Sequence, residues 1–140
     1  MAEKSLLSEF SRKAMQRLAD KKIPKKQKLH IPSMDMDVTI RSLTYAEMMD
    51  CTDAEDSSDA QRSDKYAVYL SMVEPDLKTA AREIMDAEAG LPLEQRSLLE
   101  PLDIVTTFTS TEITEIATQI MKLSGFISTA KVTVVEELKN

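Results

Sequence analysis

One stretch of this chain, residues 108–126, carries both a helix start signal and a helix stop signal, and it constrains the fold more than any other stretch. Thr109 and Glu112 have the spacing of a capping box, in which each side chain satisfies a free backbone N–H at the helix N-terminus. Gly125 can adopt the left-handed conformation that closes a helix. Between these signals the apolar residues are spaced to form one helical face. They are Ile113, Ile116, Ala117, Ile120 and Leu123.

This helical face is expected to lie in the core, because an apolar stripe on a helix usually faces the interior of a domain. A groove or seam that binds a partner is the alternative interpretation. Two flanking pairs support the helix boundaries. Phe108 and Ile113 occupy the positions of a hydrophobic staple, and Phe126 can fold back onto Met121 in a Schellman arrangement.

The N-terminal third predicts a helix followed by a small β-hairpin. Leu6, Phe10, Ala14 and Leu18 recur every four residues, which indicates a helix over residues 5–20. Period-two alternation then predicts two short strands around residues 29–31 and 36–40, joined by a turn. Thr44 and Glu47 form a second capping box, and a helix should run from Tyr45 to about Cys51.

The remaining sequence predicts further helices. One covers residues 59–74 and carries Tyr66, Tyr69, Leu70 and Val73 on one face. Another begins at Pro75 and closes at Gly90, and Pro92 and Pro101 mark two short helical starts. The chain has only two glycines, which argues against a hairpin-rich all-β fold.

The expected fold is therefore mainly α, of the α+β class, with a small β-hairpin near the N-terminus. Three segments are expected: an N-terminal helix and basic linker in residues 1–27, a helical domain with the hairpin in residues 28–126, and a tail in residues 127–140. The tail has a β-branched run followed by charge, so it is either a late strand or a disordered end.

Residues suited to catalysis are scarce. The one histidine, His30, lies in a predicted strand without metal-ligand spacing, and the one cysteine, Cys51, has acidic neighbours that disfavour its thiolate. Asp53–Asp64 resembles a calcium loop but has Ser58 where the sharp turn requires glycine, so a solvated loop is the better interpretation. We expect no enzyme activity, no cofactor and no metal.

The sequence also bears on compartment. A single cysteine allows no intramolecular disulfide, which suits a reducing environment. No apolar run approaches the ~18 residues of a membrane span, and the N-terminus lacks the apolar segment of a signal peptide. These observations favour a cytosolic protein without a membrane partner.

Charge is divided unequally along the chain. Residues 1–45 carry ten Lys/Arg and five Asp/Glu, a net of +5, whereas residues 46–140 carry eight and nineteen, a net of −11. Such a molecule could self-associate head to tail or offer a basic arm to an acidic partner. The arm lacks interleaved aromatic residues and arginine, so we do not expect nucleic acid. Its lysines are Lys21, Lys22, Lys25, Lys26 and Lys28.

Methionines form a second candidate site. Four of them lie around the predicted hairpin and the following helix start: Met34, Met36, Met48 and Met49. Flexible thioether side chains can repack against varied apolar partners, which predicts a partner-binding surface. The alternative is that they fill the junction between hairpin and helix.

Three segments together resemble a known family. They are "IRSLTYAEMMDC" after the hairpin, "YAVYLSMVEPDLK" in the helical middle, and "PLDIVTTFTSTEITEIATQIMKLSGF" at the C-terminal side. Over roughly residues 28–126 the chain is similar to the XkdN-like tail assembly chaperones of phages and prophages of Gram-positive bacteria. The ending "LSGF", with the apolar spacing before it, is the most specific part.

The resemblance implies a protein that is not an enzyme. Such a chaperone associates with the phage tape measure protein, keeps its apolar helices from aggregating and helps to recruit tail tube protein. It acts in the cytoplasm of the bacterial host and is absent from the mature virion. The alternative is a small structural tail or connector component that stays in the virion.

Overall fold

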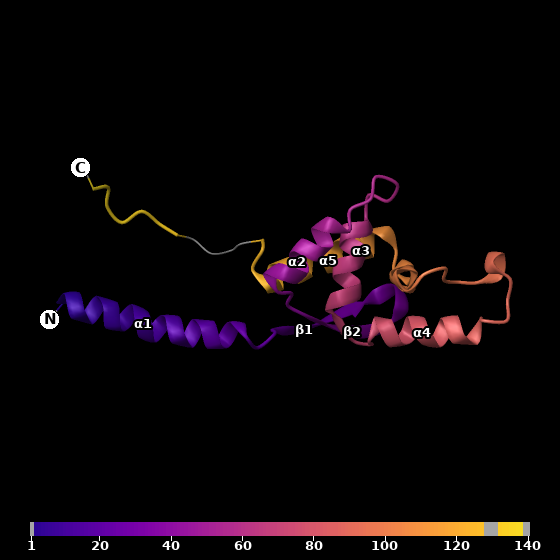
Figure 1. Cartoon of the computed structure of the whole chain (residues 1–140), viewed down its shortest axis with the longest axis horizontal. Helices are drawn as coiled ribbons and strands as arrows, with labels where there is room; N and C mark the ends of the chain where they lie inside the picture. Colours follow the sequence, from indigo (N-terminus) through magenta and orange to yellow (C-terminus); the bar gives the residue numbers. More distant parts are fainter. Residues whose placement is uncertain (1, 128–131, 139–140) are drawn as a thin grey trace.

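The computed structural model describes residues 2–127 and 132–138. The chain is mainly helical and of the α+β class, as the sequence predicts (Figure 1). The longer elements are α1 (Ala2–Lys21), β1 (Lys26–Ile31), β2 (Met36–Arg41), α2 (Tyr45–Asp53), α3 (Arg62–Ser71), β3 (Met72–Glu74), α4 (Leu77–Ala87) and α5 (Ser110–Ser124). Three short 3₁₀ helices are η1 (Pro32–Met34), η2 (Leu93–Gln95) and η3 (Pro101–Thr107).

The predicted hairpin is present and belongs to a three-stranded antiparallel sheet with the order β1-β2-β3. Leu29 pairs with Val38 in the middle of the hairpin. Asp35 has a positive φ of 48° and turns the chain between η1 and β2. The helix predicted over residues 59–74 is wrong at its end, where residues 72–74 form β3. Three residues directly after a helix are too short to show a period of two.

The boundaries of α5 are those the sequence predicts. The Glu112 backbone N–H donates to Thr109 Oγ1 at 3.2 Å, and the Thr109 N–H donates to Glu112 Oε1 at 2.8 Å. At the other end Gly125 has a φ of 81°. The Phe126 N–H donates to the Met121 carbonyl at 2.9 Å, which completes the Schellman motif.

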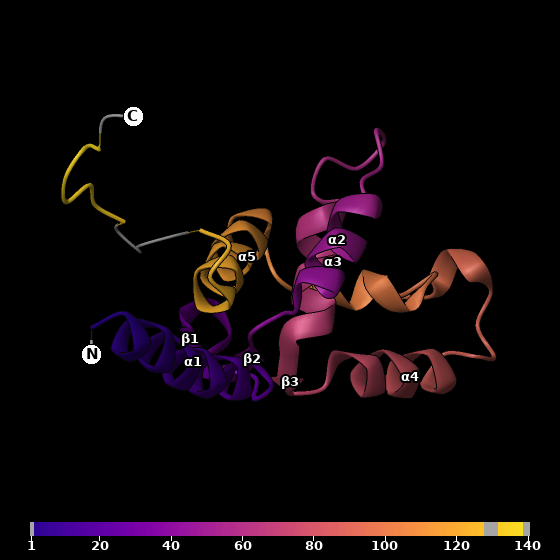
Figure 2. The same cartoon turned by 60° about the vertical axis from the view of Figure 1, so that its left-hand side comes forward.

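The core lies between the sheet and the helices α3 and α5. Figure 2 shows α2, α3 and α5 on the same side of the hairpin. The expected core face of α5 is confirmed, since Ile113, Ile116, Ala117 and Ile120 are all buried. Side chains from the three strands and from α2, α3, α4 and η3 complete this core, among them Ile40, Val68, Met72 and Val105.

The face predicted for α3 packs against the edge of the core, where Tyr66, Tyr69 and Leu70 are half-buried. Val73, the fourth residue of that predicted face, lies outside the helix, in β3. The buried residues of α3 are Ala67, Val68 and Ser71. Ser71 Oγ donates to the Arg41 carbonyl at 2.6 Å and accepts from the Arg41 N–H at 3.2 Å. These small residues let α3 approach β2 closely, which a count of large apolar residues cannot predict.

The second predicted capping box is also present, and it is joined to the sheet. Thr44 caps α2 with Glu47 as its partner. Glu47 Oε1 and Oε2 also accept from the two terminal nitrogens of Arg41 at 2.9 and 2.7 Å. The hydrogen bond from Arg41 lowers the pKa of Glu47 to about 2, with a further contribution from the Thr44 backbone. This pair fastens the first turn of α2 to the end of β2.

We expect Glu47→Gln to lower stability at neutral pH and to remove part of the acid sensitivity. Because the folded pKa of about 2 lies below the ordinary value of 4.5, the ionised Glu47 stabilises the fold fully above pH 4.5. That contribution is lost as the pH falls towards 2. Urea unfolding should show a wild-type advantage of roughly 1 kcal/mol at pH 7 that shrinks as the pH falls towards 2. Arg41→Gln should behave in the same way, and an advantage that does not change with pH would contradict this assignment.

The segment between α4 and α5 is helical only in short pieces. Asp76 caps α4, which ends at Ala87, slightly before the predicted stop at Gly90. Pro92 and Pro101 do begin helical turns, but these are the 3₁₀ helices η2 and η3. In the predicted tail, residues 132–138 have neither helix nor strand, and residues 128–131 and 139–140 lie outside the described part.

Candidate partner-binding surface

Helix α1 presents a large exposed apolar surface. It extends away from the sheet and the other helices (Figure 1). Leu6, Leu7, Phe10, Met15 and Leu18 are each between 60% and 73% exposed. Exposed apolar patches on small proteins commonly mark a surface that binds a partner. We call this set of five residues the α1 stripe.

The apolar repeat that predicts helix α1 also marks this surface. Repeats at every fourth residue place Leu6, Phe10 and Leu18 along one side of α1. The repeat alone cannot show whether a helix face is buried, because a core face and an exposed face have the same spacing. The structure decides the matter, because none of the described side chains of α1 is buried.

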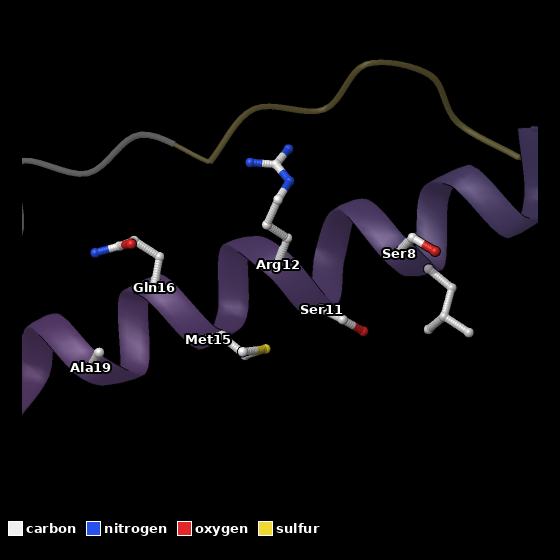
Figure 3. A pocket seen from close by; sticks show the side chains of 7 residues that line it. Ser8, Ser11, Arg12, Met15, Gln16 and Ala19 are labelled. Carbon is white, nitrogen blue, oxygen red and sulfur yellow. The ribbon is translucent and has the colours of Figure 1, made fainter.

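Beside the α1 stripe runs a shallow open hollow, formed by one helix alone. It is lined by Leu7, Ser8, Ser11, Arg12, Met15, Gln16 and Ala19. Figure 3 shows Arg12 and Gln16 pointing to one side of the helix and Ser11 and Met15 to another. An open hollow on a single helix does not suit a small molecule, which usually needs an enclosed cavity.

The four predicted methionines fall into two separate pairs. Met34 and Met36 lie at the hairpin turn, whereas Met48 and Met49 lie in α2. Met36 begins β2, whereas Met48 follows Glu47, which binds Arg41 at the other end of that strand. Met34, Met36 and Met49 are 36–39% exposed, and Met48 is half-buried. They do not form one patch.

The predicted basic linker is shorter than expected. Lys21 ends α1 and Lys22 and Lys25 lie in the connection, but Lys26 and Lys28 are in β1. All five are exposed. Alternation along the strand places Lys26 and Lys28 on the outer face of the sheet, opposite the core. The basic surface therefore continues from the end of α1 onto the hairpin.

Of the two residues considered for catalysis, His30 is paired with a carboxylate and Cys51 is buried. His30 Nδ1 lies 2.7 Å from Asp37 Oδ1 on the exposed face of the hairpin. Cys51 is buried, and burial, with Asp50 nearby, raises the pKa of its thiol to about 11. A thiol with that pKa is protonated at neutral pH and is a poor nucleophile.

The acidic loop after α2 is organised by its own hydrogen bonds. Asp56 Oδ1 accepts from the backbone N–H and the hydroxyl of Ser58, at 2.9 and 2.8 Å. Asp59 binds Lys65 at 2.9 Å. Among residues 2–127 and 132–138, no group of three His, Cys, Asp or Glu side chains is placed to hold a metal ion.

Comparisons with known proteins add no relative to this description. No protein-family model, no curated protein and no solved structure matches the chain. In the part of the chain that the structure describes, none of the helices has the length and apolar character needed to cross a membrane.

Proposed function

We propose that this chain is a tail assembly chaperone of a phage or prophage, which binds the tape measure protein and assists assembly of the tail tube. The exposed α1 stripe is the observation that supports this proposal most. Its leucines and phenylalanine lie outside the core and are available to a partner. The sequence resemblance supplies the identity of that partner, a long protein with apolar helices.

Pairing of helices gives a physical basis for the proposed binding. An amphipathic helix and an apolar helix of the partner can bury their stripes against each other at positions spaced by three or four residues. Apolar burial contributes roughly 25 cal/mol for each Å² removed from water. Met15 on α1, with the exposed methionines elsewhere, can adapt to partner helices of different shape. Holding such helices would keep them from aggregating.

The proposal assigns no reaction to the chain. The histidine is paired with Asp37 at the surface, and the cysteine is buried with a raised pKa. We propose that the protein acts in the cytoplasm of the bacterial host and is released before the virion is complete. The tail tube protein is the second proposed partner, recruited around the tape measure protein.

The direct test is co-expression with the tape measure protein encoded by the same phage or prophage. A chaperone should raise the soluble fraction of that protein and should co-purify with it. Mass spectrometry of purified particles should not detect the chain. If the chain stays in the particles and does not change solubility, it is a structural tail or connector component instead.

The basic segment should add attraction that depends on salt. Replacing Lys21, Lys22, Lys25, Lys26 and Lys28 by Gln should weaken binding to the tape measure protein at low ionic strength. At 1 M salt the Debye length shortens to about 3 Å, so the variant and the wild type should bind equally. Pull-down of the purified proteins at 50 mM and 1 M salt measures this difference. A loss that persists at 1 M salt would mean that the lysines act through direct contacts or through the fold.

A further inference from the structure

We propose that a second copy of this chain adds its segment 132–138 as a strand to the free edge of β1, in the hollow beside α5. This surface is separate from the α1 stripe, and the inference does not depend on the proposed function. Four features of the described residues support it: the edge strand, the hollow, the segment and the charge at each.

The first feature is the unpaired side of β1. In the sheet order β1-β2-β3, β1 has β2 as its one neighbour among the described strands. The Ser42 N–H donates to the Lys25 carbonyl at 2.8 Å. Because antiparallel bonds alternate, the backbone groups of Lys26, Lys28 and His30 then face away from β2. Such an edge is a template for an additional strand.

The hydrogen bonds of β2, the strand paired with β1, support this alternation. Arg41 lies opposite Lys26, and its N–H and carbonyl are both hydrogen-bonded to Ser71 Oγ on the side away from β1. The backbone groups of this residue pair therefore point outwards from the hairpin on both strands.

The second feature is a hollow between β1 and α5. From the strand it is lined by Leu29, His30 and Ile31. From the helix it is lined by Thr114, Glu115, Ile116, Thr118 and Gln119. A groove with an edge strand on one side and a helix on the other is the arrangement in which proteins bind extended peptides by strand addition. Alternate side chains of the added strand would face this hollow.

The third feature is the segment 132–138, whose sequence is VTVVEEL. Its β-branched residues favour a strand, yet it has no helix or strand in this structure. Val132, Val134, Val135 and Leu138 are at least 80% exposed. Alternation would place Val132 and Val134 on one face, towards the hollow, and Thr133, Val135 and Glu137 on the other. Glu136 shares the face of the two valines but lies nearer the basic beginning of β1.

The fourth feature is charge, which sets the direction of the added strand. The edge is basic at its beginning, where Lys25, Lys26 and Lys28 lie, and the segment is acidic near its end at Glu136 and Glu137. An antiparallel strand brings these two ends together. With Glu137 opposite Lys26, Val135 lies opposite Lys28 and Val134 opposite Leu29.

The antiparallel direction of the added strand favours the tail of a second copy over the chain's own tail. The Leu43 N–H donates to Ser124 Oγ at 2.8 Å, so α5 ends near the beginning of β1. A tail that continued directly from that point would run parallel to β1 and carry its two glutamates away from the lysines. The tail of a second copy has no such restriction, and two copies can exchange tails reciprocally.

Sedimentation of the full-length protein over a range of concentrations tests association. We expect a dimer that Val134→Asp weakens at least about tenfold, because the new charge would face Leu29 and the hollow. Thr133→Asp is the matched control, with the same charge on the opposite face, and should leave the dimer within about twofold of wild type. A wild-type protein that remains monomeric at all concentrations, or two variants with equal effects, would overturn the proposal.

The edge can be tested from the other side. Lys28→Pro removes an N–H that faces the free edge, so it should block strand addition without removing a hydrogen bond of the hairpin. Lys28→Ser is the control for the lost charge and should weaken the dimer less. If Lys28→Pro is folded by circular dichroism and dimerises like Lys28→Ser, the free edge of β1 is not the docking site.

Cross-linking distinguishes a second copy from the chain's own tail. A Lys28→Cys protein mixed with a Val135→Cys protein should form a mixed disulfide dimer under mild oxidation. The native Cys51 is 2% exposed and should not react, which a wild-type mixture verifies. A cross-link that forms only within a single chain carrying both cysteines would assign the edge to the chain's own tail and overturn the proposed exchange.

Discussion

Replacing Ile120 by Asp should destabilise the domain strongly. Ile120 is fully buried on α5, in the core shared with the sheet and α3. A carboxylate at this position would have neither water nor a partner, and the apolar contacts of the isoleucine would be lost. We expect a loss of roughly 4–5 kcal/mol or more, against a total stability of about 5–15 kcal/mol for a typical domain.

Urea unfolding followed by circular dichroism measures this effect. Thr111→Asp is the control, because Thr111 is exposed in the first turn of the same helix, where an acidic side chain is tolerated or favourable. It should change stability by less than about 0.5 kcal/mol. An Ile120→Asp protein with a wild-type midpoint would show that this face of α5 is open to solvent, and the partner-binding interpretation of α5 would then replace the core interpretation.

The combined replacement of Leu6, Phe10 and Leu18 by Gln should abolish solubilisation of the tape measure protein. These residues form most of the α1 stripe and are 60–70% exposed, so they contribute little to the fold. Glutamine keeps a good helix propensity while removing the apolar side chain. We expect the soluble fraction of the co-expressed partner to fall at least about tenfold, while the melting temperature changes by less than about 2 °C.

A matched variant separates the stripe from the helix that carries it. Ser5, Ser8 and Arg12 lie on the opposite side of α1, and their combined replacement by Gln should leave solubilisation intact. Circular dichroism of both variants should show the same helix content. If the stripe variant still solubilises the partner, the two methionine pairs, at Met34 and Met36 and at Met48 and Met49, are the next surfaces to replace.

Local sequence determined the elements whose partners lie within a few residues. The capping boxes at Thr44 and Thr109 and the Schellman turn at Gly125 each depend on residues at most six positions apart. The hairpin follows from alternation in two adjacent strands. Such interactions can be predicted without knowledge of the rest of the fold, because the backbone geometry of a helix end or a hairpin fixes which residues meet.

Contacts between distant segments were decided by the tertiary structure alone. Ser71 is buried because its hydroxyl binds the Arg41 backbone thirty positions away, and β3 is a strand because β2 offers it an edge. The α1 stripe has the spacing of a core helix, yet all five of its side chains are exposed. Periodicity reports which residues share a face, whereas burial depends on what the whole chain places against that face.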